Sequence, residues 1–341
     1  MNHAPPRPYR VLVATNMYPH DRDPVSGTFV KAQVDSLRDI GMDVDVFHIR
    51  GDLSALQYLR AIPAFREAVR RFRADVVYAF YGLTGWVAVW QSRPLVLSLA
   101  GDDILGTPTG RGGGITLKSQ IGIALSQWAA RRAAVVCVQS EEMRQRLWGQ
   151  KVRRRALVVP YGVDPQRFRP GHQASARARL GLPQEELLVI FPNTPSETRK
   201  RLDLAEAAMA IVRRDVPNAC LRIVTRVPHQ DMPDYYRAAD CCLLTSDWEG
   251  SPNVVKEALL CGLPVVTTDV GDVQRWVPLS PESAICDRSP AALAEGILRV
   301  LREKRRVDPA PFVAGFSSLA IARQMITLFG RAVAARSGGA S

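Results

Sequence analysis

The segment 241–268, CCLLTSDWEGSPNVVKEALLCGLPVVTT, constrains the fold more than any other part of this chain. Two short apolar runs, 241–245 and 263–267, have the length and composition of buried strands. Between them, Ser251 is a predicted N-cap and Pro252 the first residue of a helix with an apolar side. The segment therefore predicts a βαβ unit with its loop at the carboxyl end of a strand, where open α/β sheets bind ligands.

Two carboxylates flank the N-terminus of that predicted helix. Glu249 lies in the loop before it, and Glu257 lies eight positions further on, inside it. The first N–H groups of a helix have no intrahelical acceptor and the dipole is positive there, so this N-terminus suits a phosphate. We predict that Glu249 faces a developing positive charge and that Glu257 accepts hydrogen bonds from ligand hydroxyls. Taken singly, each acid has a plainer interpretation, Glu257 as a solvated helix residue and Glu249 as a loop acid. The residues predicted to surround the phosphate are Ser251, Pro252, Asn253 and Val254.

The complete string EGSPNVVKEALLCGLPVV resembles the signature of the family 4 retaining glycosyltransferases, two glutamates separated by seven residues. The resemblance implies the GT-B fold: an α/β chain with two doubly wound, Rossmann-like domains, an interdomain cleft and a C-terminal crossover helix. It implies an acceptor-side domain at 1–165, onto which a helix at about 317–341 packs back, and a nucleotide-sugar donor-binding domain at 166–316. The string PYGVD at 160–164 resembles the hinge between them, with Tyr161 where asparagine is usual.

Three further segments resemble parts of the donor site in that family. The string SGTFV places Gly27 where a glycine-rich loop faces the donor diphosphate, and Val227 is implied as a backbone contact to the nucleobase. Arg199 and Lys200 belong to a run of three cations at a predicted helix N-terminus, where the helix dipole disfavours positive charge, so the run suggests an anion site. Lys200 matches the diphosphate-binding lysine of the family. The matching arginine normally lies where this chain has 194–195, so Arg199 is the predicted substitute.

On the acceptor side, the string LSLAGDDILGTP resembles a family segment in which a histidine precedes a glycine and an aspartate. Here Ala100 stands in the histidine position, so no role of that histidine is carried over. Asp102 and Asp103 are the catalytic candidates, because two acids follow a predicted strand beside glycines. The alternative is that they cap the next helical turn. His229, after the predicted nucleobase segment, is interpreted as a surface loop residue.

Charge is unevenly distributed along the chain. The net charge is +12, and residues 1–160 hold 22 Lys and Arg against 13 Asp and Glu, a balance of +9. This excess fits an anionic acceptor or peripheral contact with an anionic membrane surface. Charge alone also fits nucleic acid, but the sequence has no helix-turn-helix, zinc-finger or RNA-binding signature, so we predict no nucleic-acid partner.

Cysteine spacing and hydropathy indicate in which cellular compartment the protein is expected. The six cysteines do not have the spacing of metal ligands, and we interpret them as reduced thiols in the core. We therefore predict that the protein binds no metal ion. The N-terminal residues lack the apolar core of a signal peptide, and the most apolar stretch, 76–90, is too short to span a bilayer. We expect a cytoplasmic protein that can lie at the inner membrane face.

The resemblance implies transfer of a sugar from a UDP- or GDP-linked donor to a hydroxyl acceptor, with retained anomeric configuration and without metal or cofactor. Synthesis of glycan, glycolipid or cell-envelope polysaccharide is the expected setting. Other functions remain as alternatives: a nucleotide-sugar epimerase or a phosphorylase on the same fold, a non-catalytic subunit that binds sugar nucleotides, or a nucleic-acid-binding protein.

Overall fold

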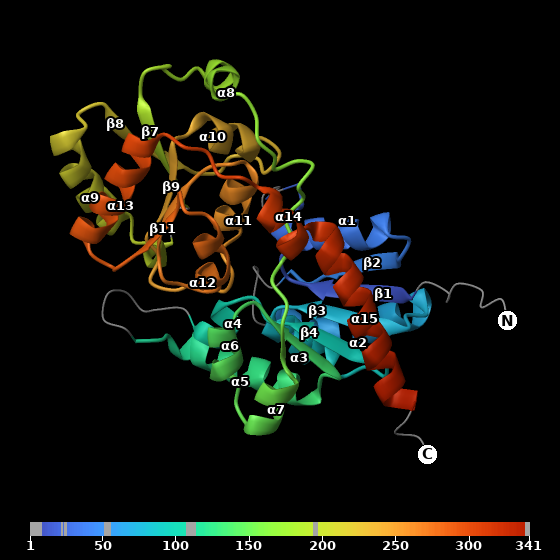
Figure 1. Cartoon of the computed structure of the whole chain (residues 1–341). Coiled ribbons are helices and arrows are strands. Elements are labelled where there is room, and N and C mark those ends of the chain that lie inside the picture. The colour runs from blue at the N-terminus through green and yellow to red at the C-terminus, as the bar shows by residue number, and fades with distance from the viewer. Residues whose placement is uncertain are drawn as a thin grey trace. The chain divides into compact units, whose positions relative to one another are not determined.

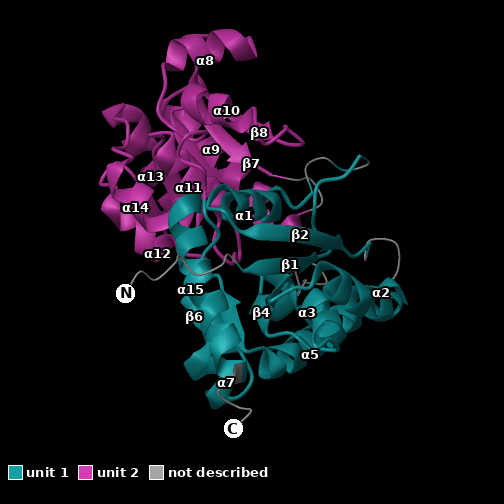
Figure 2. Cartoon of the chain, turned by 90° about the vertical axis from the view of Figure 1, so that its right-hand side faces the viewer, with its two compact units in different colours: residues 1–162, 318–341 teal, residues 163–317 magenta. Residues whose placement is uncertain are grey.

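The computed structural model of the chain describes residues 9–21, 23, 26–50, 56–106, 114–193 and 197–337. It divides into two compact units, one formed by residues 1–162 and 318–341 and the other by residues 163–317 (Figure 2). Residues 194–195, the place of the family arginine, lie outside the described residues.

Unit 1 is built on a parallel sheet of six described strands in the order β2-β1-β3-β4-β5-β6 (Figure 1). The central strands are rich in valine, leucine and alanine and are buried on both faces, as parallel sheets require. Because β3 follows β2 in sequence but lies beside β1, the chain changes direction between β1 and β3, and the loops after these two strands diverge there. The strands are β1 (Arg10–Thr15), β2 (Asp43–His48), β3 (Val76–Phe80), β4 (Leu95–Ser98), β5 (Val135–Val138) and β6 (Leu157–Val158).

Helices cover both faces of this sheet. One apolar cluster joins it to α2, α3 and α5, and a second joins it to α1 and α15. The apolar side of α15 that enters the second cluster includes Met325, Leu328 and Phe329. The described helices are α1 (Thr28–Asp39), α2 (Leu56–Phe72), α3 (Gly82–Ala88), α4 (Asp102–Leu105), α5 (Leu117–Arg132), α6 (Glu141–Arg146), α7 (Gln150–Arg155) and α15 (Ser318–Ser337).

Unit 2 has a parallel sheet of five described strands in the order β11-β10-β9-β7-β8. Here the direction changes between β7 and β9, so the loops after these strands diverge and leave a place for a ligand. The strands are β7 (Leu187–Pro192), β8 (Ala219–Val224), β9 (Cys241–Leu244), β10 (Val265–Thr268) and β11 (Ala284–Cys286).

The helices of unit 2 also lie on both faces of its sheet. One cluster packs α9 and α13 against the strands, and the other gathers α8, α10, α11 and α14. The α-helices are α8 (Gln173–Leu180), α9 (Leu202–Asp215), α10 (Met232–Ala238), α11 (Asn253–Leu260), α12 (Val273–Trp276), α13 (Pro290–Glu303) and α14 (Ala310–Phe316), with 3-10 turns η1 (Thr198–Lys200) and η2 (Val277–Leu279). The two doubly wound α/β units confirm the predicted fold class.

Candidate functional site

The change of direction in unit 2 brings two predicted segments into contact. The turn η1 follows β7, and the segment holding Glu249 follows β9. Backbone contacts join them: the Asp247 N–H donates to the Arg199 carbonyl oxygen at 2.8 Å, and the Thr245 hydroxyl donates to the Lys200 carbonyl oxygen at 2.8 Å. The sheet order therefore decides that cations far earlier in the sequence lie beside the first glutamate.

One oxygen of Glu249 is the centre of this cluster. Its Oε1 lies 2.7 Å from Arg199 Nη1 and 2.9 Å from Lys200 Nζ, and it accepts a hydrogen bond from the Ser246 hydroxyl at 2.8 Å. Glu249 and Lys200 are only 7% and 8% exposed. Burial alone would raise the pKa of Glu249, but Lys200 and Arg199, with the hydrogen bonds from Lys200 and Ser246, outweigh it and lower the pKa to about 2. The carboxylate is therefore anionic at neutral pH.

Arg199 has further contacts that fix its guanidinium. It pairs with Glu197 at 3.0 Å, and its guanidinium carbon lies 4.9 Å from the ring centroid of Trp248. The three cations lie at the N-terminus of α9 as predicted: Arg199 and Lys200 end the 3-10 turn, and Arg201, left-handed with φ 53°, is the N-cap of α9. The helix was predicted to start at Lys200 or Arg201 and begins one or two residues later, at Leu202. The strain at Arg201 accompanies a turn that directs two cations toward Glu249.

The helix after Glu249 begins later than predicted. Pro252 is the N-cap of α11 and Asn253 its first residue, so the predicted cap at Ser251 is wrong. The Ser251 hydroxyl instead donates to Asp272 Oδ2 at 2.8 Å, an oxygen that also accepts from Trp276 Nε1 at 2.8 Å. The N–H groups of Asn253 and Val254 are the first two of the helix and have no intrahelical acceptor.

Two residues near this helix N-terminus were not predicted as site residues from the sequence. Lys256 is 1% exposed, and burial lowers its pKa to about 8 against the opposing charges of Asp272 and Glu257. Gly271, with φ 61°, lies so close to the loop that a Cβ would come within 2.8 Å of the Gly250 carbonyl oxygen. A lysine in the predicted apolar side of α11 is the signal that could have suggested this packing.

Glu257 lies in α11, and two side chains already bond it. His229 Nε2 lies 2.9 Å from Oε1, and the Tyr236 hydroxyl donates to Oε2 at 2.7 Å. Glu257 is 5% exposed, and the His229 ring lies 5.1 Å from that of Phe168. His229 was predicted to be a surface loop residue. It does lie in a loop, but its ring bonds a buried acid. Val227, two residues earlier, packs against the same apolar cluster.

In unit 1, the two adjacent aspartates differ in their surroundings. Asp102 is exposed at the start of α4, whereas Asp103 is 2% exposed. Asp103 accepts hydrogen bonds from the N–H groups of Ala100, Gly101 and Gly82 at 2.8–3.0 Å. Burial outweighs these bonds and raises the pKa of Asp103 to about 6, with Asp102 adding to the rise. Asp103 thus joins the loop after β4 to the start of α3.

Gly27 occupies the loop that follows β1 in unit 1. It precedes α1 in a left-handed conformation, φ 61°, and its carbonyl accepts from the N–H groups of Val30 and Lys31. A Cβ on Gly27 would lie 2.3 Å from the Met17 carbonyl, so only glycine fits. Tyr81, after β3, also has a positive φ, 82°, which a bulky residue rarely adopts. Sequence reasoning did not single out Tyr81 as a strained residue.

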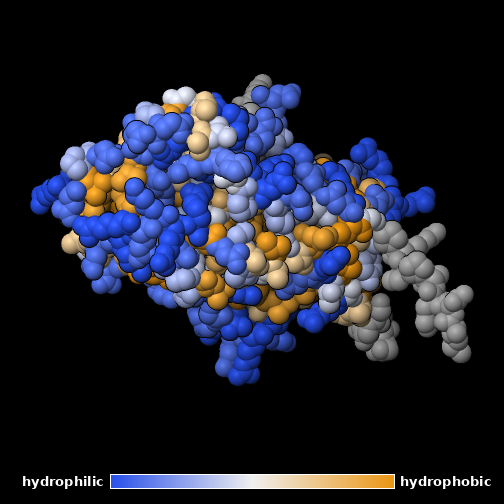
Figure 3. All heavy atoms as spheres, turned by 45° about the horizontal axis from the view of Figure 1, so that its top comes forward, coloured by the Kyte–Doolittle hydropathy of each residue, from blue (hydrophilic) through white to orange (hydrophobic). Residues whose placement is uncertain are grey.

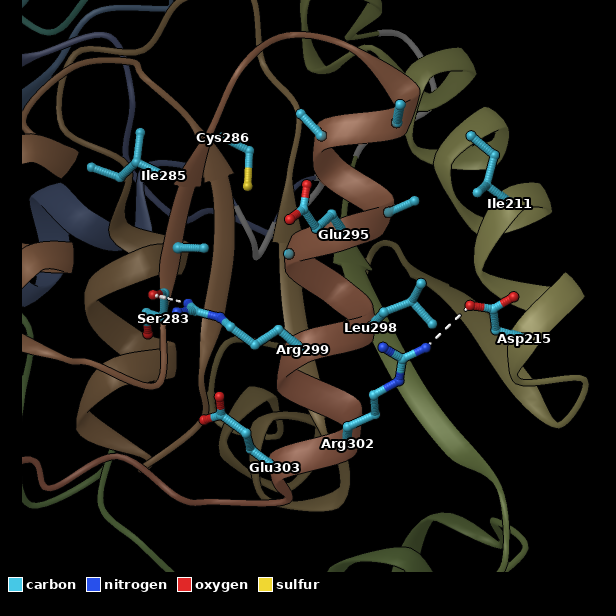
Figure 4. A pocket seen from close by; sticks show the side chains of 15 residues that line it. Ile211, Asp215, Ser283, Ile285, Cys286, Glu295, Leu298, Arg299, Arg302 and Glu303 are labelled. Atoms are coloured by element: carbon cyan, nitrogen blue, oxygen red, sulfur yellow. Dashed lines mark hydrogen bonds and ion pairs between the residues drawn. The ribbon is translucent and has the colours of Figure 1, made fainter.

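A cavity of about 960 Å³ lies away from these residues, between β11, α9 and α13 (Figure 4). Arg302 pairs with Asp215 across its rim, and Arg299 donates to the Ser283 carbonyl oxygen at 2.7 Å. It contains none of the predicted donor residues.

The described residues offer neither a metal-binding cluster nor a membrane-spanning helix. Among the described residues, no group of three or more His, Cys, Asp and Glu side chains is arranged to hold a metal ion. Within the same ranges, no helix combines the length and the apolar character needed to cross a bilayer. On the face in Figure 3, hydrophilic residues predominate and hydrophobic ones form separate groups.

Comparisons with families and with curated proteins agree on one class. A family model described as a glycosyl transferase 4-like domain matches residues 6–162, and one described as glycosyl transferases group 1 matches residues 203–303. TuaC of Bacillus subtilis strain 168, named as a glycosyltransferase of teichuronic acid biosynthesis, is 27% identical over 361 aligned residues, covering 86% of this chain and 90% of TuaC. D-inositol 3-phosphate glycosyltransferase 1 of Catenulispora acidiphila is 28% identical, covering 70% of this chain and 66% of that protein.

Solved structures share the fold at low identity. Sucrose-phosphate synthase from Thermosynechococcus elongatus superposes with a TM-score of 0.79 at 20% identity, over 96% of this chain and all of that one. HepE from Anabaena, solved with UDP and glucose, gives a TM-score of 0.68 at 16% identity, over 94% of this chain and all of that one.

Proposed function

The chain belongs to the group 1 glycosyltransferases, family 4, which have the GT-B fold, and on that premise we propose that it transfers a sugar from a nucleotide-diphosphate donor to a hydroxyl acceptor with retained configuration. The observation that carries the proposal is the cluster of Glu249 with Arg199 and Lys200 beside the N-terminus of α11. Solved HepE structures that contain UDP or UDP-glucose support a nucleotide-sugar donor.

The donor diphosphate would lie between two cationic elements of unit 2. Arg199 and Lys200 offer full positive charges, and the N–H groups of Asn253 and Val254 offer the positive end of a helix. In the ligand-free structure Glu249 neutralises the two cations, so a bound diphosphate would share or replace that carboxylate. Ser251 and Pro252 would shape the loop, and Val227 would contact the base through its backbone. Gly27, in the loop after β1 of unit 1, stays a predicted diphosphate-loop residue.

Glu257 would recognise ribose through the lone pairs that His229 and Tyr236 leave open. Both carboxylate oxygens already accept one hydrogen bond, and each oxygen can accept a second. His229 and Tyr236 hold the carboxylate in one orientation, which reduces the entropy lost when a hydroxyl binds. Glu257 is therefore proposed as a donor-binding residue and not as a proton carrier.

The reaction breaks the bond between the anomeric carbon and the diphosphate oxygen, and forms a bond from the acceptor oxygen on the same face. The leaving diphosphate gains negative charge, which Arg199, Lys200 and the α11 N–H groups stabilise without moving. The anomeric carbon gains positive charge, which the anionic Glu249 would offset. The acceptor proton passes to an oxygen of the departing phosphate. Since Arg199 and Lys200 would neutralise the negative charge of the phosphate, we propose that no metal ion is needed.

The acceptor side would lie in unit 1, where Asp102 is exposed after β4 and is the better placed of the two aspartates to meet a ligand. Asp103 would act by holding the loop. The similarity to TuaC supports a cell-envelope polysaccharide as the product, and the positive charge of residues 1–160 favours an anionic or lipid-linked acceptor at a membrane surface.

Calorimetric titration with UDP, GDP, ADP and their sugars, with and without a chelator, tests the donor site. We expect one base to bind, the chelator to have no effect, and Lys200→Ala to abolish binding while the exposed-lysine control Lys151→Ala retains it. Binding that survives Lys200→Ala would overturn the assigned site. Consumption of a nucleotide sugar without any acceptor would favour an epimerase, and binding without nucleotide release in the presence of an acceptor panel would favour a binding subunit.

A further inference from the structure

A second cavity in unit 1, of about 430 Å³, is lined by four arginines. It lies at the amino end of β4, whereas ligands of α/β sheets bind at the carboxyl ends. The arginines come from four separate segments: Arg93 from the turn before β4, Arg132 from the end of α5, Arg155 from the end of α7 and Arg336 from the end of α15. The ends of α7 and α15 both lie at the lower edge of unit 1 in Figure 1.

These four charges are not paired with a carboxylate among the described residues. The cavity lining contains no Asp or Glu, and within the described ranges none of the four guanidinium groups forms an ion pair. Asp75 lines a smaller neighbouring cavity together with Arg93 and Arg336 but forms an ion pair with neither of them, and its Oδ2 accepts from the backbone N–H of Arg10 at 2.9 Å.

Two of the arginines are held in place by the fold. Arg155 Nη2 donates to the carbonyl oxygens of Ala130 and Arg131 at 2.7 and 2.8 Å, and the guanidinium carbon of Arg132 lies 4.0 Å from the ring centroid of Trp128. The Nε of Arg155 is buried and meets no hydrogen-bond acceptor among the described residues. A buried donor without an acceptor costs free energy, and packing within the described residues does not offset that cost with a bond.

Arginine at a helix C-terminus is favourable by itself, because it complements the helix dipole. This explains Arg132, Arg155 and Arg336 one at a time. It does not explain Arg93, which belongs to no helix, nor the convergence of all four on one cavity, nor the unsatisfied Nε.

We propose that this cavity binds an anion carrying phosphate groups, with at least two negative charges. Guanidinium groups bond phosphate oxygens in pairs, and the volume lies within the range of small-ligand sites. The phosphate belongs either to a free anion, such as a diphosphate, or to a lipid headgroup. Trp90, 47% exposed and 5.6 Å from Trp128 between ring centroids, would then rest at the lipid surface. The site is separate from the proposed donor site, since none of its residues belongs to unit 2.

Calorimetry with inorganic pyrophosphate at constant ionic strength tests this site. Because the donor site also attracts pyrophosphate, the titration is done in the Lys200→Ala background as well as in the native chain. We expect the Lys200→Ala protein to bind pyrophosphate, and the added pair Arg93→Gln and Arg336→Gln to weaken binding at least about tenfold. These two side chains make no bond or ion pair to the rest of the described chain, so their replacement leaves the fold intact. The control is Arg131→Gln, an exposed arginine outside the lining.

The source of the phosphate is separated by co-sedimentation with phosphatidylglycerol vesicles, using phosphatidylcholine vesicles as the neutral reference. Vesicle binding that falls in the Arg93→Gln/Arg336→Gln pair and that pyrophosphate displaces assigns a lipid headgroup. Pyrophosphate binding without vesicle binding assigns a free anion. The proposal is overturned if the protein binds neither pyrophosphate nor vesicles, or if the Arg93→Gln/Arg336→Gln substitutions leave binding unchanged. A failure of the proposed donor site is seen separately, because the native chain would then bind no nucleotide.

Discussion

Glu249 in unit 2 and Asp103 in unit 1 are both buried carboxylates in segments that follow parallel strands, yet their partners differ in kind. Asp103 is bonded by three backbone N–H groups, which cannot leave without unfolding the loop. Glu249 is bonded by two cationic side chains and a hydroxyl, groups that can also bond a phosphate oxygen. Their pKa values move in opposite directions, to about 2 for Glu249 and to about 6 for Asp103.

The comparison indicates how to separate a reactive carboxylate from a structural one. Full positive charges keep Glu249 ionised despite burial, whereas amide dipoles only partly offset the burial of Asp103. A carboxylate paired with cationic side chains can share those cations with a bound diphosphate. One that closes a backbone loop contributes to stability.

The largest effect is expected from Glu249→Gln. Loss of the charge that offsets the developing cation should lower turnover by about 10²–10³, while nucleoside-diphosphate affinity stays the same or rises, because a competing anion is removed. Stopped assays of nucleotide release and calorimetry measure the two quantities. The control is Glu197→Gln, which pairs with Arg199 from a more exposed position and should change turnover only a few-fold. Native turnover in a folded Glu249→Gln protein would remove the electrostatic role.

Asp103→Asn should mainly reduce stability. The amide group would place a donor against backbone N–H donors and leave at least one of them without an acceptor, which should lower the free energy of unfolding by about 1–3 kcal/mol. Urea denaturation measures the change. The matched control is the exposed neighbour, Asp102→Asn, expected to stay within about 0.5 kcal/mol. A stable Asp103→Asn protein with no turnover would instead make Asp103 a reacting group, and a turnover loss in Asp102→Asn would support its acceptor role.

Gly27→Ala should destabilise the protein more than Gly41→Ala, although both glycines flank α1 with positive φ. Each substitution meets the left-handed penalty of about 1–2 kcal/mol. Only Gly27 adds a collision, since a Cβ at Gly41 has nothing within 4 Å. Thermal denaturation of both variants measures the difference, and equal shifts would show that the loop after β1 moves aside easily.

The smallest effect is the pH dependence, and its sign differs between the two carboxylates. Glu249 has a folded pKa below its ordinary 4.5, so its contribution to stability is present above pH 4.5 and is lost as pH falls toward 2. Asp103 has a folded pKa above its ordinary 3.8, so its contribution is present below that pH and is lost as pH rises through 6. The measurement is the unfolding free energy of the native chain minus that of each amide variant, at several pH values between about 3 and 7. This difference should rise with pH for Glu249→Gln and fall with pH for Asp103→Asn. Parallel slopes would contradict the assigned environments.

Most of the fold followed from local pattern. Apolar runs and helix signals predicted the alternating strands and helices, and the two glutamates in EGSPNVVKE indicated the glycosyltransferase family, which the comparisons confirm. Boundaries were less accurate: Ser251 was expected to cap α11, but its hydroxyl bonds Asp272, a residue from the turn after the next strand. A competing long-range acceptor cannot be seen from the neighbouring residues.

The sequence by itself determined the two α/β halves and the residue types of the candidate site, because periodicity and turn chemistry act over a few residues. Only the tertiary structure decided which of those residues meet. Strand order brings Arg199 and Lys200 into contact with Glu249. Packing of the helices pairs His229 with Glu257. Four arginines, from Arg93 to Arg336 in the sequence, line one cavity. These contacts depend on the order of strands in a sheet and on burial, which bring together residues that are distant in the chain.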